Sequence, residues 1–317
     1  MTTSNRGRIG FAFVPQSTPQ AVDLVARAER AGVDTAWTVM PAVGLDTLTI
    51  FAAAAMKSER IALGTAIVPA FTRHPVAMAD QVMALESLAP GRLRLGIGTA
   101  HARTMEAVFH FDFRKPLSWL REYTEVLQPL LHSGEVHFRG EFYEVDAQIA
   151  KPVQTPIYHS ALRAPAFELA GELTAGGLAW LCPPEYLRRV ALPALETGAA
   201  RAGRQRPPLL AHMPVVVSAD RGRAYALAKE QIGYYAAAPF YARMFRDAGH
   251  PLDADGRITD GLLDILLVYG TPDEIARKLQ ERLDGGMDEI YPSMFPLDDK
   301  EREEDVLLGV LGELARS

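Results

Sequence analysis

The chain has 317 residues, of which 48% are hydrophobic and 23% are charged, and its formal net charge at pH 7 is −6. Such a composition is typical of a globular enzyme. No long basic run accompanies the negative charge, which argues against nucleic acid as a partner, because phosphate binding needs clustered Lys and Arg.

Cysteine usage and hydropathy favour a reducing compartment. The single cysteine, Cys182, is expected to be inert, and it excludes an internal disulfide bond and a zinc site built on cysteines. The first residues lack the apolar core of a signal peptide, and no uncharged apolar run reaches the ~20 residues of a membrane span. We therefore expect a cytoplasmic protein that acts on a small molecule and has no membrane partner.

Short β-type runs alternate with helical patterns along the whole chain. The clearest helix start is Thr271, which caps the helix, with Pro272 in the first turn and Glu274 completing a capping box. Strands are predicted at residues 9–14, 35–39, 61–67, 93–98, 156–159, 177–181, 209–217 and 288–291. Helices are predicted at 18–31, 45–57, 75–88, 119–131 (after a long loop), 165–173, 184–202, 220–237, after 239, from 271, and up to about 314.

Eight successive strand–helix units indicate an α/β protein with a (β/α)8 barrel, or TIM barrel. A doubly wound sheet is the alternative, but it would normally show a phosphate-binding loop early in the chain, and none is visible. Neither a linker nor a low-complexity segment interrupts the pattern, so residues 1–317 are interpreted as one domain.

Two insertions interrupt the alternation of strands and helices. Residues 134–146 contain two short alternating runs around Arg139-Gly140, which predict a small hairpin. Residues 248–264 are polar, rich in Gly and Asp, and weakly periodic. They form either a mobile lid near strand seven or an ordinary surface loop.

The residues that follow the strands indicate the available chemistry, because a (β/α)8 barrel has its active site at the carboxyl ends of its strands. No Asp or Glu directly follows strands one to six, which argues against a two-carboxylate glycosidase. No HExxH motif or paired-histidine spacing supports a metal site, and no GxSxG elbow or Walker-type GKS or GKT sequence is present. The set is small, apolar and basic, and it suits a site whose chemistry belongs to a bound organic ring.

Small residues at two neighbouring strand ends fit a flat ring laid against backbone. The third strand ends at Thr65, Ala66 and Ile67, and the fourth ends at Gly98 and Thr99. The sequence Gly96-Ile97-Gly98 begins like a dinucleotide-binding fingerprint, but His101 stands where the third glycine is needed, so the signal is weak. Thr99, and Ser160 at the end of strand five, offer hydroxyl groups to a ring edge or a phosphate.

His101 is the best candidate for proton transfer, because an imidazole can donate a proton near neutral pH. A histidine bonded to local backbone is the alternative, and the strand-end position favours the functional interpretation. Arg163 lies just before a predicted helix, where N–H groups and the helix dipole favour an anion; a solvated surface arginine is the alternative.

For three other histidines and two tryptophans, a packing role is at least as well supported by the sequence as a functional role. His159 ends strand five and either reaches the site or packs in the core, whereas His212 fits core packing and His74 fits a helix start. Trp37 and Trp180 lie in predicted strands, where core packing is favoured over a ring-stacking wall.

Five sequence blocks occur in order along the chain: RIALGTAIVPAFTRHP, GRLRLGIGTAH, LREYTEVLQPLLHSGEVHFRGEFYEV, PIYHSALRAPAFELAGELTAGGLAW and GTPDEIARKLQERLDGGMDEI. Together they resemble the luciferase-like family of flavin- and deazaflavin-dependent oxidoreductases over nearly the whole chain. Within that family, the chain is most similar to actinobacterial members labelled as users of coenzyme F-420, a deazaflavin that carries hydride.

The resemblance implies a (β/α)8 barrel with insertions, often a homodimer, that binds a ring cofactor. The third strand would end in a non-prolyl cis peptide that supports the ring, here Ala66-Ile67. The end of strand five would meet the phosphate side of the cofactor through Ser160, Ala161, Leu162, Arg163 and Ala164.

One segment departs from the family pattern. Many deazaflavin-using relatives end the second strand with Trp-x-x-Asp-His, and that Asp and His serve the chemistry. Here Met40 and Pro41 occupy those positions and cannot handle a proton, and His101 aligns with a Glu of some relatives. Reduction of an activated C=C or C=N bond needs only hydride and one proton donor, which fits a site with His101 alone.

Three functional hypotheses remain open. The first is hydride transfer between coenzyme F-420 and a small organic substrate, and the resemblance favours it. The second is an FMN-dependent monooxygenase that uses reduced flavin and oxygen, since nitrogen at ring position five supports oxygen chemistry whereas carbon passes hydride. The third is a cofactor-binding but catalytically idle paralogue, which the missing Asp-His pair allows.

Overall fold

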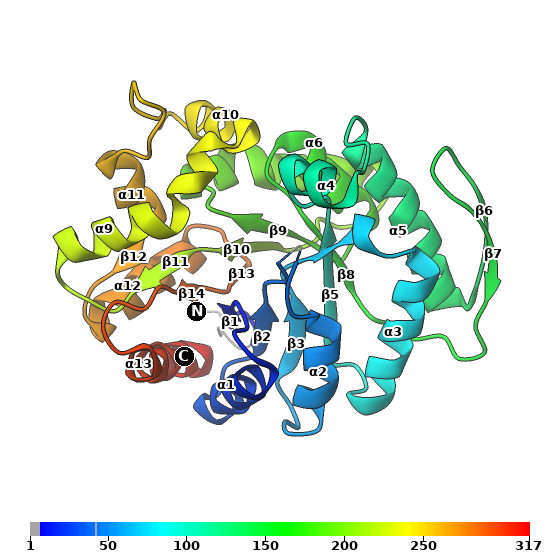
Figure 1. The fold of residues 1–317 in the computed structure, drawn as a ribbon, viewed down its shortest axis with the longest axis horizontal. Helices are drawn as coiled ribbons and strands as arrows, with labels where there is room; N and C mark the ends of the chain where they lie inside the picture. The colour runs from blue at the N-terminus through cyan, green and yellow to red at the C-terminus, as the bar shows by residue number, and fades with distance from the viewer. Residues whose placement is uncertain (1–6, 42) are drawn as a thin grey trace.

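The computed structural model describes residues 7–41 and 43–317, and it contains a ring of parallel strands with helices outside it (Figure 1). The strands of this ring and its extensions are β1 (Gly10–Phe13), β2 (Thr35–Thr38), β3 (Ala62–Thr65), β4 (Val68–Pro69), β5 (Leu93–Gly98), β8 (Ile157–Ser160), β9 (Gly176–Trp180), β10 (Leu209–His212), β11 (Pro214–Val216), β12 (Val268–Tyr269), β13 (Glu289–Ile290) and β14 (Ser293–Met294).

Parallel pairing closes these strands into a barrel. From β1 the order runs through β2, β3, β5, β8, β9 and β10 to β13. The last strand then returns to the first, because Ser293 of β14 pairs with Ala12 of β1, and Ile290 of β13 forms a bridge with Ile9. The fold is therefore the (β/α)8 barrel that the strand–helix alternation predicts.

Helices follow the strands and pack around the barrel (Figure 1). The helices that the sequence predicts are α1 (Thr18–Ala31), α2 (Thr47–Ala55), α3 (Pro75–Leu88), α5 (Pro116–Ser133), α6 (Ala164–Leu173), α7 (Pro184–Tyr186), α8 (Leu192–Arg201), α9 (Arg221–Ile232), α10 (Pro239–Asp247), α12 (Pro272–Asp284) and α13 (Lys300–Arg316). A π-helical segment, η2 (Leu187–Ala191), joins α7 to α8, and a 3-10 segment, η3 (Gly233–Ala237), follows α9.

Local capping explains two of the sharpest helix boundaries. The Ser17 side chain accepts from the Gln20 N–H at the start of α1, and Gly32 ends that helix in the left-handed conformation, with φ of 93°. The capping box at α12 is confirmed, since the Thr271 hydroxyl accepts from the Glu274 N–H and the Glu274 carboxylate accepts from the Thr271 N–H.

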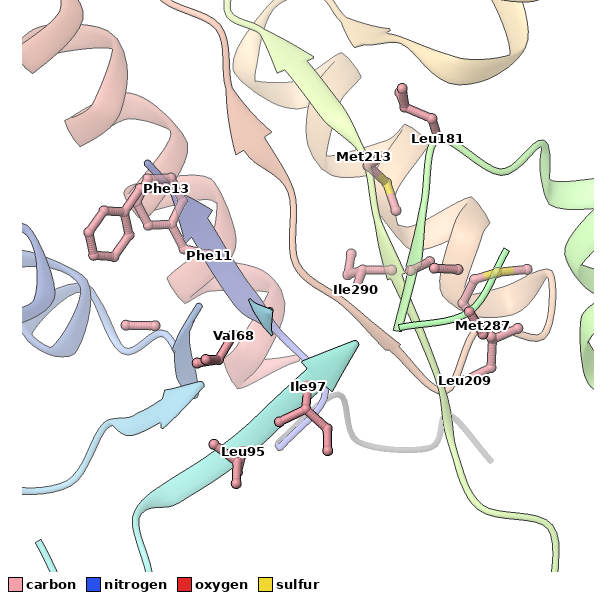
Figure 2. Close-up of a cluster of buried hydrophobic side chains, with 14 of the residues drawn as sticks. Phe11, Phe13, Val68, Leu95, Ile97, Leu181, Leu209, Met213, Met287 and Ile290 are labelled. Carbon is pink, nitrogen blue, oxygen red and sulfur yellow. The ribbon is translucent and has the colours of Figure 1, made fainter. Parts of the chain in front are cut away.

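The apolar core includes side chains from β1, β5, β10 and β13. Figure 2 shows Phe11, Leu95, Ile97, Leu209 and Ile290 in this core, where each is at most 1% exposed. A separate cluster comes from β1, β2, β8, β9 and β10 and from the residue after β13, and it consists of Ala12, Trp37, Tyr158, Leu178, Leu210 and Tyr291. Since successive strand residues point to opposite faces, this second cluster fills the barrel interior.

Two glycines make room for the largest side chain of the interior cluster. A Cβ atom at Gly10 would lie 2.6 Å from the Trp37 indole, and one at Gly64 would lie 2.3 Å from it. Both contacts are shorter than any that packed side chains tolerate, so these positions accept only glycine while Trp37 keeps its place.

Three strands differ from their predicted extents. The strand predicted at 61–67 is interrupted between β3 and β4, strand seven divides into β10 and β11 at Met213, and strand eight consists of β13 and β14. The long loop predicted before residue 119 was wrong, because it contains α4 (Ala102–Phe109), and α5 already begins at Pro116. Met105 is the one buried residue of α4, so this helix lacks the repeating apolar pattern that predicts a helix.

The first insertion forms an antiparallel hairpin of β6 (Glu135–Arg139) and β7 (Glu144–Gln148), where the sequence analysis expects one. It projects from the barrel at the right of Figure 1. The carboxylate of Glu122, on α5, accepts from the N–H groups of residues 141–143 and thereby fixes the turn to the helix.

The second insertion, residues 248–264, contains the start of a helix, α11 (Asp260–Leu266). Ile258 is only 5% exposed, and the Asp253 carboxylate accepts from the N–H groups of Asp255 and Arg257, so hydrogen bonds and packing hold the segment. Its movement as a lid stays a prediction. In the described part of the chain, no helix combines the length and the apolar character that a membrane crossing requires.

Candidate active site

The floor of the barrel mouth is made of backbone. A Cβ atom at Gly98 would lie 2.0 Å from the Ser160 Oγ, and one at Gly96 would lie 1.9 Å from the Thr65 carbonyl oxygen. Neither position has room for a side chain. Both glycines are buried, so the ends of β3, β5 and β8 meet here through backbone and the Ser160 hydroxyl, and we call this meeting of strand ends the floor.

The Ala66-Ile67 peptide bond is cis, as the family resemblance predicts. It lies between β3 and β4, and the Ala66 N–H donates to the Thr38 carbonyl of the neighbouring strand at 2.9 Å. Both residues are partly exposed and pack against the interior cluster. They form an edge beside Gly98, because β4, which follows them, pairs with β5 through Pro69 and Gly98.

The predicted cofactor-binding residues divide by exposure. Ala66, Ile67, Thr99, Ser160, Leu162, Arg163 and Ala164 are partly exposed at neighbouring strand ends. Thr65, Gly98 and Ala161 are buried. The Thr65 hydroxyl donates to the Gly96 carbonyl at 2.7 Å, so this side chain serves the barrel wall and leaves only backbone for a ligand.

Arg163 combines a helix start with a free donor. It is the N-cap residue of α6, and its buried Nε has no hydrogen-bond partner among the residues that the structure describes. One terminal nitrogen lies 3.6 Å from the Asp247 carboxylate at the end of α10. An anion at this strand end would meet both the guanidinium and the N-terminus of α6.

His101 lies at the rim, where α4 begins. It is the N-cap residue of α4, but its side chain makes no capping hydrogen bond. The ring is solvent-exposed on one side and packs against Tyr235 and Tyr241, with ring centroids 5.7 and 6.1 Å away. Desolvation by these neighbours lowers the pKa of His101 below its usual value, so the neutral imidazole predominates at pH 7.

An aromatic wall stands beside His101, and sequence reasoning missed part of it. Trp180 lies 4.1 Å from the His212 ring and 6.1 Å from the Tyr235 ring, and His212 stacks on Tyr291 at 4.7 Å. Trp180 is partly exposed and packs against the apolar core, as the sequence favours, and it also contacts the rings of His212 and Tyr235. Tyr235 belongs to η3, outside any predicted strand end, and only its contacts identify it.

The rings of this wall are uncharged at neutral pH. Burial lowers the pKa of His212 to about 3, and its Nε2 shares a hydrogen bond with the Ser293 hydroxyl. Burial also raises the pKa of the Tyr235, Tyr241 and Tyr291 hydroxyl groups. The wall therefore offers a dry, neutral surface to a planar molecule.

Several other predicted candidates have structural roles. His159 does not reach the mouth: it is fully buried, and its Nε2 lies 2.8 Å from the Thr124 hydroxyl on α5. Since that hydroxyl donates to the Leu120 carbonyl, it accepts from Nε2–H of His159. His74 caps α3 by accepting from the Val76 N–H, and burial raises the pKa of the Cys182 thiol.

The end of β2 carries no group that can transfer a proton. Met40 stands 4.0 Å, through its sulfur, from the Arg73 guanidinium, which pairs with Asp46 at 2.8 Å. Burial alone would raise the pKa of Asp46, but hydrogen bonds from Arg73 and Thr49 lower it overall. Asp46 therefore stays ionised and caps α2.

A buried ion pair lies deeper in the barrel, below the floor. Arg94 binds Glu289 with two hydrogen bonds of 2.8 Å and donates to the Tyr158 hydroxyl at 3.0 Å. The Trp37 indole N–H donates to the same Glu289 carboxylate at 3.2 Å, and the guanidinium lies 4.7 Å from the Trp37 ring. These contacts fix Trp37, which packs 5.0 Å from Tyr291.

Two hollows elsewhere on the surface are lined by residues outside the barrel mouth. The two that stand out have volumes of about 510 and 430 Å³ and lie at the start of α13 and along α5. In the part of the chain that the structure describes, no three His, Cys, Asp or Glu residues gather as a metal site would require.

Comparison with known proteins agrees with the barrel fold. Residues 4–289 match the sequence model of the luciferase-like monooxygenases. The chain belongs to this family. It is therefore an oxidoreductase. Relatives in the family include proteins that use coenzyme F-420 and proteins that use FMN.

Two curated relatives are similar over most of their length. The F-420-dependent glucose-6-phosphate dehydrogenase of Nocardia farcinica is 27% identical over 308 residues, which cover 89% of this chain and 90% of the relative. The 5,10-methylenetetrahydromethanopterin reductase of Archaeoglobus fulgidus is 24% identical over 310 residues, which cover 89% and 92%.

Two solved structures share the fold. An F-420-dependent secondary alcohol dehydrogenase, in complex with an F-420–acetone adduct, has a TM-score of 0.81 and 18% identity, covering 98% of this chain and all of the other. The oxygenating constituent of the 3,6-diketocamphane monooxygenase of Pseudomonas putida, in complex with FMN, has a TM-score of 0.74 and 16% identity, covering 97% and 98%.

Proposed function

We propose that this enzyme uses coenzyme F-420 to transfer hydride to a small organic substrate, reducing an activated C=C or C=N bond. The backbone floor at the ends of β3, β5 and β8 carries this proposal. A flat ring fits over Gly98 and against the Ala66-Ile67 edge, where a side chain at Gly98 would collide with Ser160. Sequence similarity to F-420-dependent relatives supports the deazaflavin.

The residues around the floor fit the remainder of such a cofactor. Thr99 and Ser160 would bind the ring edge or the first hydroxyl groups of the tail, and residues 161–164 would hold its phosphate. The unpaired Nε of Arg163 and the first turn of α6 supply the donors that an anion needs. When bound, the deazaflavin supplies a hydride from carbon five of its ring; the protein supplies position and environment.

His101 would provide the proton that completes a reduction. Its imidazole is free of capping hydrogen bonds and faces the aromatic wall across the rim. Because its pKa is lowered, the protonated form that can donate is populated at acidic pH, and the neutral form at pH 7 suits proton acceptance in the reverse direction. Met40 and Pro41 follow β2 and cannot transfer a proton, so His101 would act without a second proton-transfer group from that strand end.

The aromatic wall would hold the substrate against the exposed face of the cofactor ring. Trp180 and Tyr235 present neutral faces, and they exclude water from the place where hydride moves. A conjugated, planar substrate without a charge suits this surface better than a sugar phosphate. The family resemblance also supports a homodimer, which sedimentation velocity would test.

A binding titration tests the proposal. Purified protein is titrated with coenzyme F-420 and, separately, with FMN, and the absorbance and fluorescence of each cofactor are recorded. We expect tight binding of F-420 and oxidation of the reduced coenzyme by an activated alkene or imine. Tight FMN binding with no F-420 binding would overturn the proposal in favour of an FMN-dependent monooxygenase. Binding of F-420 with no turnover of a broad panel of such substrates would favour the idle paralogue.

A further inference from the structure

We propose that Asp247 makes the phosphate end of the cofactor site selective for a singly charged phosphodiester over a terminal phosphate. The inference rests on the proposed function, because it concerns the phosphate side of the same cofactor. Coenzyme F-420 carries its phosphate as an internal diester with one negative charge. FMN carries a terminal phosphate, which approaches two negative charges at neutral pH because its second pKa is about 6.

The first observation is the ion pair that joins Arg163 to Asp247. The guanidinium and the carboxylate are 3.6 Å apart, and the two side chains are 28% and 43% exposed. The separation exceeds that of a hydrogen-bonded pair, so Arg163 and Asp247 interact as an ion pair without a direct hydrogen bond. Nε of Arg163 remains buried and unpartnered among the described residues, and so keeps a donor for an anion.

The second observation is the position of Asp247 in its helix. It is the last residue of α10, where the helix dipole disfavours a carboxylate. Helix stability therefore does not account for an acidic residue at this position. Its partner, Arg163, belongs to a different unit of the barrel, at the start of α6, so the pair joins two segments at the mouth.

The third observation is the neutrality of two further groups near the pair, Tyr186 and Cys182. Tyr186 is 3% exposed, and burial, with a smaller contribution from Cys182, raises its pKa to about 12; Arg163 opposes this shift and Asp247 adds slightly to it. Its hydroxyl is therefore uncharged at pH 7. The thiol of Cys182 is also uncharged, because burial raises its pKa.

These charges set the selectivity. Arg163 contributes one positive charge, which Asp247 cancels. The Arg163–Asp247 pair therefore has no net positive charge to balance the second negative charge of a terminal phosphate. A diester needs only donors, which Arg163 and the start of α6 provide. A terminal phosphate would meet the Asp247 carboxylate at close range and would be repelled.

The experiment compares FMN with riboflavin, since the two share one ring and differ only in the phosphate. Dissociation constants are measured by flavin fluorescence for the wild type, Asp247→Asn and the control Asp146→Asn. Asp146 pairs with Arg139 on the distant β6–β7 hairpin. We expect Asp247→Asn to increase the affinity for FMN about two- to fivefold relative to riboflavin, as loss of one partly exposed charge allows, and the control to leave this ratio unchanged.

Each outcome decides the question. An unchanged ratio in Asp247→Asn, or an equal change for both flavins, overturns the proposal. So does the failure of FMN to bind to both proteins, whereas FMN binding gained only by Asp247→Asn supports it. Titration with F-420 tests the proposed function separately from the role of Asp247. Asp247→Asn can change the affinity for FMN relative to riboflavin in a protein that does not bind F-420. Conversely, F-420 can bind to a protein in which this relative affinity does not change.

Discussion

Gly98 and Ser160 lie so close together at the barrel mouth that a Cβ on Gly98 would be 2.0 Å from the Ser160 Oγ. Two neighbouring strands thus meet with a backbone surface on one side and a single hydroxyl on the other. Adding one methyl group at Gly98 therefore tests whether the floor must be free of side chains.

We expect Gly98→Ala to weaken binding of the cofactor ring at least tenfold, because the methyl group occupies the floor and displaces Ser160. The measurement is a fluorescence titration with coenzyme F-420. Gly309→Ala, on α13, is the matched control, since among the described residues nothing beyond its chain neighbours and its own helix backbone lies within 4 Å of the added methyl. The double variant Gly98→Ala/Ser160→Gly relieves the collision but keeps the methyl. If it binds F-420 as tightly as the wild type, the methyl itself does not block the ring.

His101→Gln should lower the rate of substrate reduction by about 10²-fold or more at acidic pH, the usual contribution of a general acid. In the wild type the rate should fall as pH rises through the His101 pKa, which desolvation places below its usual value. The variant should lose this pH dependence. The rate is followed by the absorbance of reduced coenzyme with an activated alkene that the wild type reduces. His137→Gln, on the exposed hairpin, is the control; equal rates for both variants would exclude His101 as the proton donor.

The free energy of unfolding should decrease as pH falls from about 6.5 toward 4. Burial lowers the pKa of both His159 and His212 to about 3 in the folded state, so the unfolded chain binds protons that the folded chain refuses. Stability from these groups is complete above the unfolded pKa and is lost as pH falls toward the folded one. Urea unfolding at several pH values gives the proton uptake.

The variant His159→Gln isolates one of these two histidines. Gln keeps a donor for the Thr124 hydroxyl but does not titrate. The slope of unfolding free energy against pH should decrease by up to one proton in this pH range. An identical slope in wild type and variant would show that His159 is not held neutral.

Glu289→Ala should destabilise the fold by about 3–5 kcal/mol, because it leaves the Arg94 charge buried without its partner. It also removes the acceptor of the Trp37 indole N–H. Urea unfolding measures the change, and Asp146→Ala, which breaks an exposed ion pair with Arg139, should have a much smaller effect. Equal losses in the two variants would mean that the barrel interior does not depend on this pair.

The sequence predicts the barrel well because strand and helix periodicities are local signals. Residues 18–31 and 75–88, for example, form helices with the predicted bounds, since caps and prolines mark their first turns. The cis peptide at Ala66-Ile67 was predicted from family resemblance, not from the residues themselves. The helix α4 was missed because a single buried residue, Met105, gives no period.

The parts of the site that depend on distant contacts could not be predicted. Arg94 and Glu289 are 195 positions apart, and nothing near either residue indicates its partner. A helix is predicted over residues 220–237, but α9 ends at Ile232 and the 3-10 segment η3 follows. This change of direction brings Tyr235 into contact with His101 and Trp180. For the same reason, the pairing of Arg163 with Asp247 was not predicted.

Trp37 fills the barrel between Gly10 and Gly64 and, with the ion pair of Arg94 and Glu289, leaves no passage through the axis. Every molecule that reaches the floor must therefore enter and leave through one opening. If the proposed cofactor lies on the floor and its substrate against the aromatic wall, the cofactor would arrive first and depart last. Steady-state kinetics would then follow an ordered sequence, in which excess substrate slows the exchange of the cofactor.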